Sequence, residues 1–263
     1  MFSIVSAGVL IGIANIIPGI SGATVAVITN QYERIMTNGN QLTSGQFKSV
    51  EWGYLIGITL SAITGIYVLS WPLDFGLTHF EGGVLGLIVG LIVGSLKGVQ
   101  LGGSSRSTTL RYVNPWCMIG CIGVIGLSVI QAAPGEALTS TWWYGISGAI
   151  AMIAMLVPGV SGSMMLVLLG TYGDVIQLIK SADVVAMLPF AFGALIGGGV
   201  SVKSVQWLIQ KHSARFESFI LGAIIGSTVY ILNQVSWSES HPVGVMMALV
   251  MGYSVAKRLI HER

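Results

Sequence analysis

The stretch Pro18-Gly19-Ile20-Ser21-Gly22 interrupts an apolar segment near the start of the chain, and Pro158-Gly159-Val160-Ser161-Gly162 interrupts another one 140 residues later. Irregular backbone at membrane depth has to be buried in protein or line a polar cavity. Paired interrupted segments in two repeats therefore point to the substrate site of a transporter. More residues match at the same offset: Ile13 and Ile153, Ala14 and Ala154, Val27 and Val167, Tyr32 and Tyr172.

The composition is that of an integral membrane protein. Charged residues make up 8% of the 263 residues and hydrophobic residues 53%, against about 25% charged residues in a soluble domain. The net charge of +2 comes without a dense basic cluster, so we expect no nucleic-acid partner. Cys117 and Cys121 are expected to be inert packing residues, and no Cys or His spacing predicts a metal site.

Apolar segments divide the chain into eight parts, and six of them are close to the about 20 residues that a spanning helix needs. The first and fifth are longer and contain the two interrupting turns, so each is either a kinked spanning helix or a re-entrant hairpin. We predict an all-α polytopic membrane protein. The segments are residues 3–35, 52–72, 80–99, 112–131, 142–173, 184–203, 216–234 and 242–260.

Charge placement favours the hairpins. If segments one and five are hairpins, eleven of the twelve Lys and Arg residues fall on one side, and Lys180 alone on the other; if all eight segments cross, the split is six and six. Short cytoplasmic loops carry an excess of Lys and Arg, so both termini are expected in the cytoplasm. The eleven are Arg34, Lys48, Lys97, Arg106, Arg111, Lys203, Lys211, Arg215, Lys257, Arg258 and Arg263.

Each repeat then consists of a hairpin and three transmembrane helices, with the first repeat at residues 1–135 and the second at 136–263. Because three is odd, the second copy is inverted in the membrane relative to the first, an arrangement common in alternating-access transporters. Two further matches extend the duplication. Leu55-Ile56-Gly57 pairs with Leu195-Ile196-Gly197 at offset 140, and residues 90–95 resemble residues 222–227 at offset 132.

Each interrupting turn has the features of an anion site. A second half-helix of about 12 residues, about 18 Å long, is expected to follow it, with Ser21 or Ser161 at its N-cap position. Gly22 and Gly162 leave backbone N–H groups uncovered, and such groups at a helix start bind phosphate. The substrate-binding residues expected from the two turns are Pro18, Gly19, Ser21, Gly22, Thr24, Pro158, Gly159, Ser161, Gly162 and Ser163.

A helix end stabilises an anion by only about 0.3–1 kcal/mol, or about 2 kcal/mol when partly buried, whereas full dehydration costs several kcal/mol. The site must therefore stay hydrated, use a cation or bind a co-transported proton or metal ion. Arg34 is either a receiver of the head group or an interfacial anchor. Glu33, Glu81 and Asp174 are candidates for carrying a coupling proton. A proton or sodium gradient is thus a possible driving force, and no cofactor is expected.

The first turn lies within Ala14-Asn15-Ile16-Ile17-Pro18-Gly19-Ile20-Ser21-Gly22-Ala23-Thr24, which with Tyr32-Glu33-Arg34 resembles the first signature of the prokaryotic polyprenyl-phosphate transporter family. Residues 154–163 resemble the second signature, and residues 192–197 and 221–227 resemble further family segments. Asn15 lies in the first signature and is counted among the expected substrate-binding residues. The chain departs from the family at Ala23 and Asn30, where glycines are expected, and at Gly173-Asp174, where a second Tyr-Glu pair is expected.

The resemblance implies a flippase in the prokaryotic plasma membrane that returns undecaprenyl phosphate from the outer to the inner leaflet, with membrane lipids around it. A carrier of a small soluble anion is the main alternative. A lipid-diphosphate phosphatase is disfavoured, because Gly22 and Gly162 occupy the positions where such chemistry needs an arginine to stabilise phosphoryl charge. The chain is therefore not expected to be an enzyme.

Overall fold

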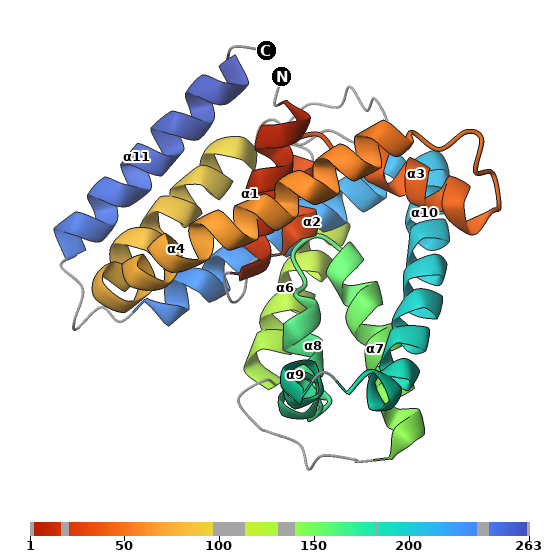
Figure 1. The fold of residues 1–263 in the computed structure, drawn as a ribbon. Helices are drawn as coiled ribbons and strands as arrows, with labels where there is room; N and C mark the ends of the chain where they lie inside the picture. Colours follow the sequence, from red (N-terminus) through yellow and green to blue (C-terminus); the bar gives the residue numbers. More distant parts are fainter. Residues whose placement is uncertain are drawn as a thin grey trace.

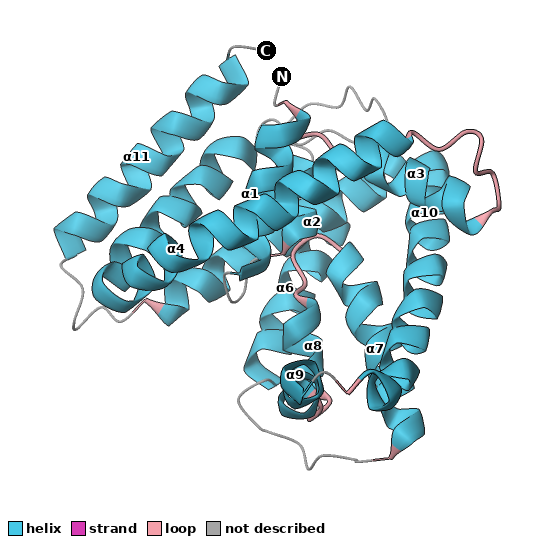
Figure 2. Ribbon diagram, viewed as in Figure 1, coloured by secondary structure: helices cyan, strands magenta, loops and turns pink. Residues whose placement is uncertain are grey.

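The computed structural model describes residues 3–16, 21–96, 114–130, 140–181, 183–235 and 242–261. Within these ranges the chain is helical, with short connecting turns and no strand (Figure 2). The all-α prediction is therefore confirmed for the described residues. Lys97, Arg106, Arg111 and Arg263, and the turn residues Pro18 and Gly19, lie outside them.

The first half contains three short helices, a long helix and a final one. Helix α1 (Ile4–Ile16) leads into the first turn, and α2 (Gly22–Ile28) and α3 (Tyr32–Thr43) follow. The long helix is α4 (Trp52–Ser95), and α6 (Pro115–Ile130) ends this half.

The second half has the same order of elements. It consists of α7 (Thr141–Leu156), α8 (Gly162–Leu168), α9 (Tyr172–Ser181), the long α10 (Val184–Gln234) and α11 (Pro242–His261). In Figure 1, α7, α8 and α9 form a group that α10 leaves on its way to α3, and α11 runs alongside α4.

The two halves share backbone angles at corresponding residues. Ser21 has φ −99° and ψ 130°, and Ser161 has φ −98° and ψ 129°. The chain bends again after each seven-residue helix, through Asn30 at φ 59° and Gly170 at φ 70°. Asparagine tolerates this left-handed conformation better than most residues, so Asn30 takes the place of the glycine expected there.

Both long helices are broken at matching points. Phe80 in α4 has φ −142° and ψ 39°, and His212 in α10, 132 residues later, has φ −136° and ψ 33°. Each long helix thus has a first arm (residues 52–79 and 184–211) and a second arm (residues 81–95 and 213–234).

The offset of 132 holds for both arms, which corrects one match made from the sequence. A Cβ on Gly65 would lie 2.6 Å from the carbonyl oxygen of Val9, and one on Gly197 would lie 2.3 Å from that of Ala149. Val9 and Ala149 are 140 residues apart, so Gly197 corresponds to Gly65 and the pairing with Gly57 is wrong. The two halves differ by eight residues between the hairpin and the long helix.

The halves exchange their last helices. Helix α6 packs against the second arm of α10, and α11 packs against the second arm of α4 (Figure 1). The contacts are equivalent: a Cβ on Gly120 or on Gly252 would lie 2.2 Å from the carbonyl oxygen of Phe219 or Leu87, respectively. Gly90 and Gly222 make the reciprocal close contacts with α11 and α6, so the match of residues 90–95 with 222–227 is confirmed.

Among the described helices, Phe75–Ser95 and Val184–Asn233 are long and apolar enough to cross a membrane. Four shorter apolar helices are Ile4–Asn15, Trp52–Val68, Pro115–Leu127 and Thr141–Leu156. Large apolar side chains are also exposed along the first arms, including Leu195 at 76% and Phe192 at 67%. A membrane protein accounts for this exposure, because lipid tails cover such side chains as well as a protein core does.

Candidate functional site

The second turn is built from Pro158 and Gly159, both buried. Gly159 has φ 88°, a conformation that L side chains rarely adopt, and a Cβ there would lie 2.6 Å from the backbone carbon of Ala223 on α10. Only glycine fits this position without strain. Pro158 and Gly159 therefore shape the turn and seat it against α10.

Two hydrogen bonds, one buried and one partly buried, join the hairpins. The backbone N–H of Gly159 donates to Oγ1 of Thr24 on α2 at 2.8 Å, and the hydroxyl of Tyr32 on α3 donates to the carbonyl oxygen of Leu156 at 2.8 Å. Thr24 and Tyr32 are each only 1% exposed. Thr24 thus holds the second turn in place, whereas the sequence analysis expected it to donate a hydrogen bond to the substrate. Because the Gly159 N–H already donates to Thr24, it is not free to bind an anion.

A cavity of about 270 Å³ lies where the hairpins meet. Its polar lining includes Asn15 and Ser21 from the first half and Ser161, Gly162 and Ser163 from the second. The structure thus brings together five of the predicted substrate-binding residues from positions more than a hundred residues apart. The rest of the lining is apolar or backbone: Gly148, Ala151, Met152, Met155, Leu166, Phe190 and Ala194.

The serine hydroxyls are not used for capping. Ser21 and Ser161 occupy the N-cap positions as predicted, but neither side chain bonds to its helix. Ser161 Oγ instead lies 2.8 Å from Ser163 Oγ. Ser21 is 5% exposed, and its hydroxyl has no hydrogen-bond partner among the described groups. Since buried polar groups are nearly always paired, this hydroxyl is suited to a ligand or a water molecule in the cavity.

Gly22 and Gly162, which follow the two serines, allow α1 and α7 to pack closely against the starts of α2 and α8. A Cβ on Gly22 would lie 2.7 Å from Oδ1 of Asn15, and one on Gly162 would lie 2.8 Å from the carbonyl oxygen of Ala151. The following helices, α2 and α8, have seven residues each, so the expected half-helices of about 12 residues are wrong. Their dipoles are correspondingly small, so an anion in this cavity would depend mainly on hydrogen bonds from the polar side chains.

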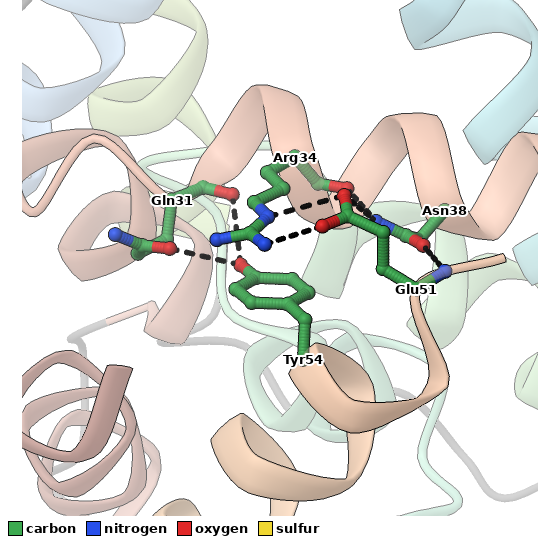
Figure 3. A network of polar contacts seen from close by, with 5 residues as sticks. All are labelled: Gln31, Arg34, Asn38, Glu51 and Tyr54. Atoms are coloured by element: carbon green, nitrogen blue, oxygen red, sulfur yellow. Dashed lines mark hydrogen bonds and ion pairs between the residues drawn. The ribbon is translucent and has the colours of Figure 1, made fainter. Parts of the chain in front are cut away.

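Arg34 does not line the cavity; it lies in a polar network between α3 and the start of α4 (Figure 3). Its guanidinium forms a bidentate ion pair with Glu51, with Nε 3.2 Å from Oε1, and stacks 3.9 Å from the ring centre of Tyr54. Asn38 accepts from the Glu51 N–H at 2.7 Å, and the Tyr54 hydroxyl donates to Gln31 at 3.0 Å.

The ion pair shifts the pKa values of both its partners. The hydrogen bond to Arg34, with a second from Asn38, lowers the pKa of Glu51, and the hydrogen bond to Glu51 raises the pKa of Arg34. Both side chains are about half exposed, at 49% and 40%. The sequence analysis did not identify Glu51 as the ion-pair partner of Arg34, because no sequence pattern shows which cation a carboxylate in a connecting segment will contact.

The predicted coupling carboxylates are spread over the molecule. Asp174 accepts a hydrogen bond from the hydroxyl of Tyr144 at 3.1 Å. Glu33 lies in the first turn of α3 and Glu81 directly after the break in α4, and none of the three lines the cavity. Glu217, which is 1% exposed on the second arm of α10, was missed. A carboxylate inside the apolar segment 216–234 is a functional candidate by default, so the sequence contained a signal for it.

Comparisons with a family model and with individual proteins point to the same family. The sequence model of the VCA0040-like family, described as undecaprenyl phosphate translocase-like, matches residues 11–245. A polyprenyl-phosphate transporter of Vibrio cholerae is 27% identical over 236 residues, covering 84% of this chain and 74% of the relative. A polyprenyl-phosphate transporter of Staphylococcus aureus is 27% identical over 273 aligned positions, covering 95% of each chain. No solved structure matches.

Proposed function

The chain belongs to the undecaprenyl phosphate translocase-like family, and on this basis we propose that it carries undecaprenyl phosphate across the prokaryotic plasma membrane, from the outer to the inner leaflet. The observation that carries the proposal is the cavity between the hairpins. It offers polar atoms from both halves, and one of them, the buried Ser21 hydroxyl, has no partner among the described groups.

We place the phosphate head against Asn15, Ser21, Ser161 and Ser163. Hydrogen bonds to a charged group contribute about 1.5–3 kcal/mol each, so a few of them offset the partial dehydration of a phosphate, whereas a short helix end does not. The head group therefore keeps some of its water in the cavity. Arg34 acts as an anchor of the α3–α4 connection in this proposal, because its charge is committed to Glu51.

Two re-entrant hairpins in inverted repeats are the topology we propose, with both termini in the cytoplasm. Helix α3 packs on α10, with Thr37 Oγ1 3.4 Å from Gln206 Nε2 and Gly39 next to Val202. Complete crossing of all eight segments would put the residues after α3 and the break in α10 on opposite sides of the membrane. Their packing supports the hairpin topology and the positively charged cytoplasmic side.

We propose coupling to a proton or sodium gradient, with Glu33, Glu81, Asp174 and Glu217 as the carboxylates to test. Glu217 is placed first among them because it is the most deeply buried of the four, and burial penalises the charged form of a carboxylate. Substitution of each by its amide, followed by measurement of transport with and without an imposed pH or sodium gradient, identifies the group involved. If transport by all four variants depended on the gradient as strongly as transport by the unmodified protein does, this part of the proposal would be contradicted.

The proposal is tested by reconstituting the protein in vesicles with fluorescent undecaprenyl phosphate and measuring its exchange between leaflets. Ser21→Ala combined with Ser161→Ala is expected to slow exchange at least about tenfold, since 1.4 kcal/mol corresponds to a factor of ten. The matched control is Ser204→Ala combined with Ser254→Ala. These two hydroxyls bond to carbonyl oxygens of their own helices at 2.8 and 2.7 Å, away from the cavity.

Exchange that is equally fast in both double variants would remove the cavity from the mechanism. Transport of inorganic phosphate or a sulfonate without transport of the lipid would overturn the proposal in favour of a small-anion carrier. Release of phosphate from a lipid diphosphate by the purified protein would show an enzyme instead.

A further inference from the structure

Two fully buried hydroxyl groups in the second half have no hydrogen-bond partner among the described residues. They belong to Ser147 on α7 and to Thr171 at the bend between α8 and α9, and both residues are 0% exposed. Several helical serines elsewhere bond to a carbonyl oxygen of their own helix, as Ser204 and Ser218 do. Ser147 does not form this bond, so its hydroxyl, like that of Thr171, is available to a ligand.

Both hydroxyls belong to the interface between α7 and the bend after α8, within the group formed by α7, α8 and α9 (Figure 1). Trp143 of α7 donates from Nε1 to the carbonyl oxygen of Leu169 at 3.3 Å, and Ala151 packs in one buried cluster with residues of α8 and α9. Ser147 lies one helical turn from each of Trp143 and Ala151 and therefore shares their face of α7. Thr171 follows Leu169 by two residues.

A carboxylate lies at the edge of this interface. Asp174, in the first turn of α9 and three residues after Thr171, accepts a hydrogen bond from the hydroxyl of Tyr144 at 3.1 Å. Tyr144 is three residues before Ser147, and both Asp174 and Tyr144 are partly exposed. The bend also ends a half-helix, α8, and the C-terminal ends of half-helices coordinate sodium ions in transporters with interrupted helices.

The first half has protein groups and a built-in cation at the corresponding place. Gln31 donates from Nε2 to the carbonyl oxygen of Thr29 at 3.4 Å and accepts from the hydroxyl of Tyr54 at 3.0 Å. Arg34, three residues later, supplies a permanent positive charge, whereas the second half has a carboxylate at that position. The pairs that match at offset 140 are Ala7 and Ser147, Gln31 and Thr171, and Arg34 and Asp174.

We propose that Ser147, Thr171 and Asp174 bind a sodium ion at the bend after α8. The inference deepens the proposed coupling, on which the role of the ion in transport rests, by naming the ion and one of the four carboxylates. One carboxylate with neutral oxygen atoms balances one positive charge, so a monovalent ion fits, whereas a divalent ion would leave a buried charge uncompensated.

The place of this site connects it to the substrate cavity and to the outside. Ala151 and Leu166 line the cavity and pack in one cluster with Val175 of α9, so an ion at the bend would lie behind the cavity wall. In the proposed topology the second hairpin enters from the outside, where sodium is the abundant monovalent cation.

Thermal unfolding in micelles without lipid substrate measures the binding, because a ligand of the folded state raises the unfolding temperature. The unmodified protein is expected to unfold at least about 2 °C higher in sodium chloride than in choline chloride of equal concentration. Ser147→Ala combined with Thr171→Val should lose this difference. The matched control, Ser227→Ala combined with Thr228→Val, should keep it, since these buried hydroxyls bond to the carbonyl oxygen of Ile224 at 2.9 and 2.7 Å.

The same double variant separates a sodium site from hydroxyls that bind water or nothing. Removal of buried hydroxyls without a ligand is neutral or stabilising, so Ser147→Ala with Thr171→Val would then unfold at an equal or higher temperature in both salts. That result would overturn the inference, and so would an equal rise of the unmodified protein in potassium chloride. Loss of stability in sodium chloride alone supports the site.

Asp174→Asn tests the charge of the site. It is expected to weaken the apparent affinity for sodium at least about tenfold. Tyr144→Phe, which removes only the hydroxyl that bonds to this carboxylate, should retain the sodium response. An unchanged sodium affinity in Asp174→Asn would overturn the assignment of the carboxylate and with it the inference.

The sodium site and the proposed function fail in different experiments. Unfolding that does not respond to sodium, in a protein that exchanges undecaprenyl phosphate between leaflets, overturns the sodium site and leaves the transport of the lipid standing. A sodium response in a protein that exchanges no lipid overturns the proposed function and leaves the sodium site.

Discussion

The first and second hairpins share backbone angles at their serines and at the bends after α2 and α8, but different side chains surround them. In the first half, the backbones of α1 and α4 touch at Gly12, and Arg34 pairs with Glu51. In the second half, α7 and α10 are also in backbone contact, with a Cβ on Gly148 2.2 Å from the carbonyl oxygen of Phe190, but Met152 stands at the position of Gly12 and lines the cavity. The positions of Arg34 and Glu51 are taken there by two carboxylates, Asp174 and Asp183, which cannot form an ion pair with each other.

This difference assigns separate tasks to two copies of one unit. The first half supports the second turn, because its α2 and α3 reach across to it through Thr24 and Tyr32. The second half provides most of the cavity lining. Two copies of one unit thus contribute unequally to the cavity, because a few of their side chains differ.

The largest expected effect tests whether the two turns are equivalent. Gly159→Ala introduces strain at a positive φ, about 1–3 kcal/mol, and overpacking against Ala223, another about 1–3 kcal/mol. We expect the free energy of unfolding to fall by about 2–6 kcal/mol, measured by denaturant titration in micelles. Gly19→Ala should lower the free energy of unfolding by a similar amount if the first turn has the same shape as the second.

Gly173→Ala is the control, because a Cβ there has open space around it. A tolerated Gly19→Ala beside a disruptive Gly159→Ala would show that the turns differ.

The next effect tests the packing of α1 on α4. Gly12→Ala places a methyl group against the carbonyl oxygen of Ala62, and such overpacking costs about 1–3 kcal/mol. Thermal unfolding should show a clear loss of stability, whereas Gly126→Ala on α6, where a Cβ meets nothing within 4 Å, should be neutral or stabilising. Equal stability of the two variants would mean that α1 and α4 are not in backbone contact.

A smaller effect is expected at the bridge between the hairpins. Thr24→Val keeps the shape of the side chain and removes the acceptor of the Gly159 N–H, which leaves a buried donor unpaired at a cost of about 1–3 kcal/mol. Thr24→Ser retains the acceptor and should stay close to the unmodified protein. The comparison uses unfolding free energies, and a valine variant as stable as the serine variant would contradict the bridge.

The smallest effect concerns the exposed ion pair that locks the first half. Because Arg34 lowers the pKa of Glu51, this carboxylate stabilises the folded state above its ordinary pKa, and the contribution disappears as pH falls through the lowered value. Glu51→Gln should flatten the acid side of the profile of unfolding temperature against pH. Asp183→Asn, at the corresponding position of the second half, should leave that side steep; identical profiles would contradict the assignment.

Local signals in the sequence were enough to locate the turns and the duplication. Proline and glycine act on the backbone of their own turn, so Pro158, Gly159 and the N-cap serines stand where they were predicted. The gathering of Asn15, Ser21 and Ser161 at one cavity also follows, because matching turns of two copies meet near the centre of the molecule.

Features that depend on distant contacts were not predictable. Helices α2 and α8 end after seven residues because a second turn follows each of them. In the first half, the only sequence signal for this second turn is Asn30, a residue type that tolerates the left-handed conformation. The eight-residue difference between the halves produced a false register for Gly57. The partner of Arg34 is another such case, since it lies seventeen positions away in a different element.

The exchange of α6 and α11 between the halves has a consequence for biosynthesis. The second arm of α4 is made early, yet among the described helices its glycine-lined face at Gly86, Gly90 and Gly94 contacts α11, which is synthesised about 150 residues later. Contacts between such distant parts of a chain form late, so this groove must wait in the bilayer or against an insertion chaperone. Synthesis of α11 is thus the event that closes this groove.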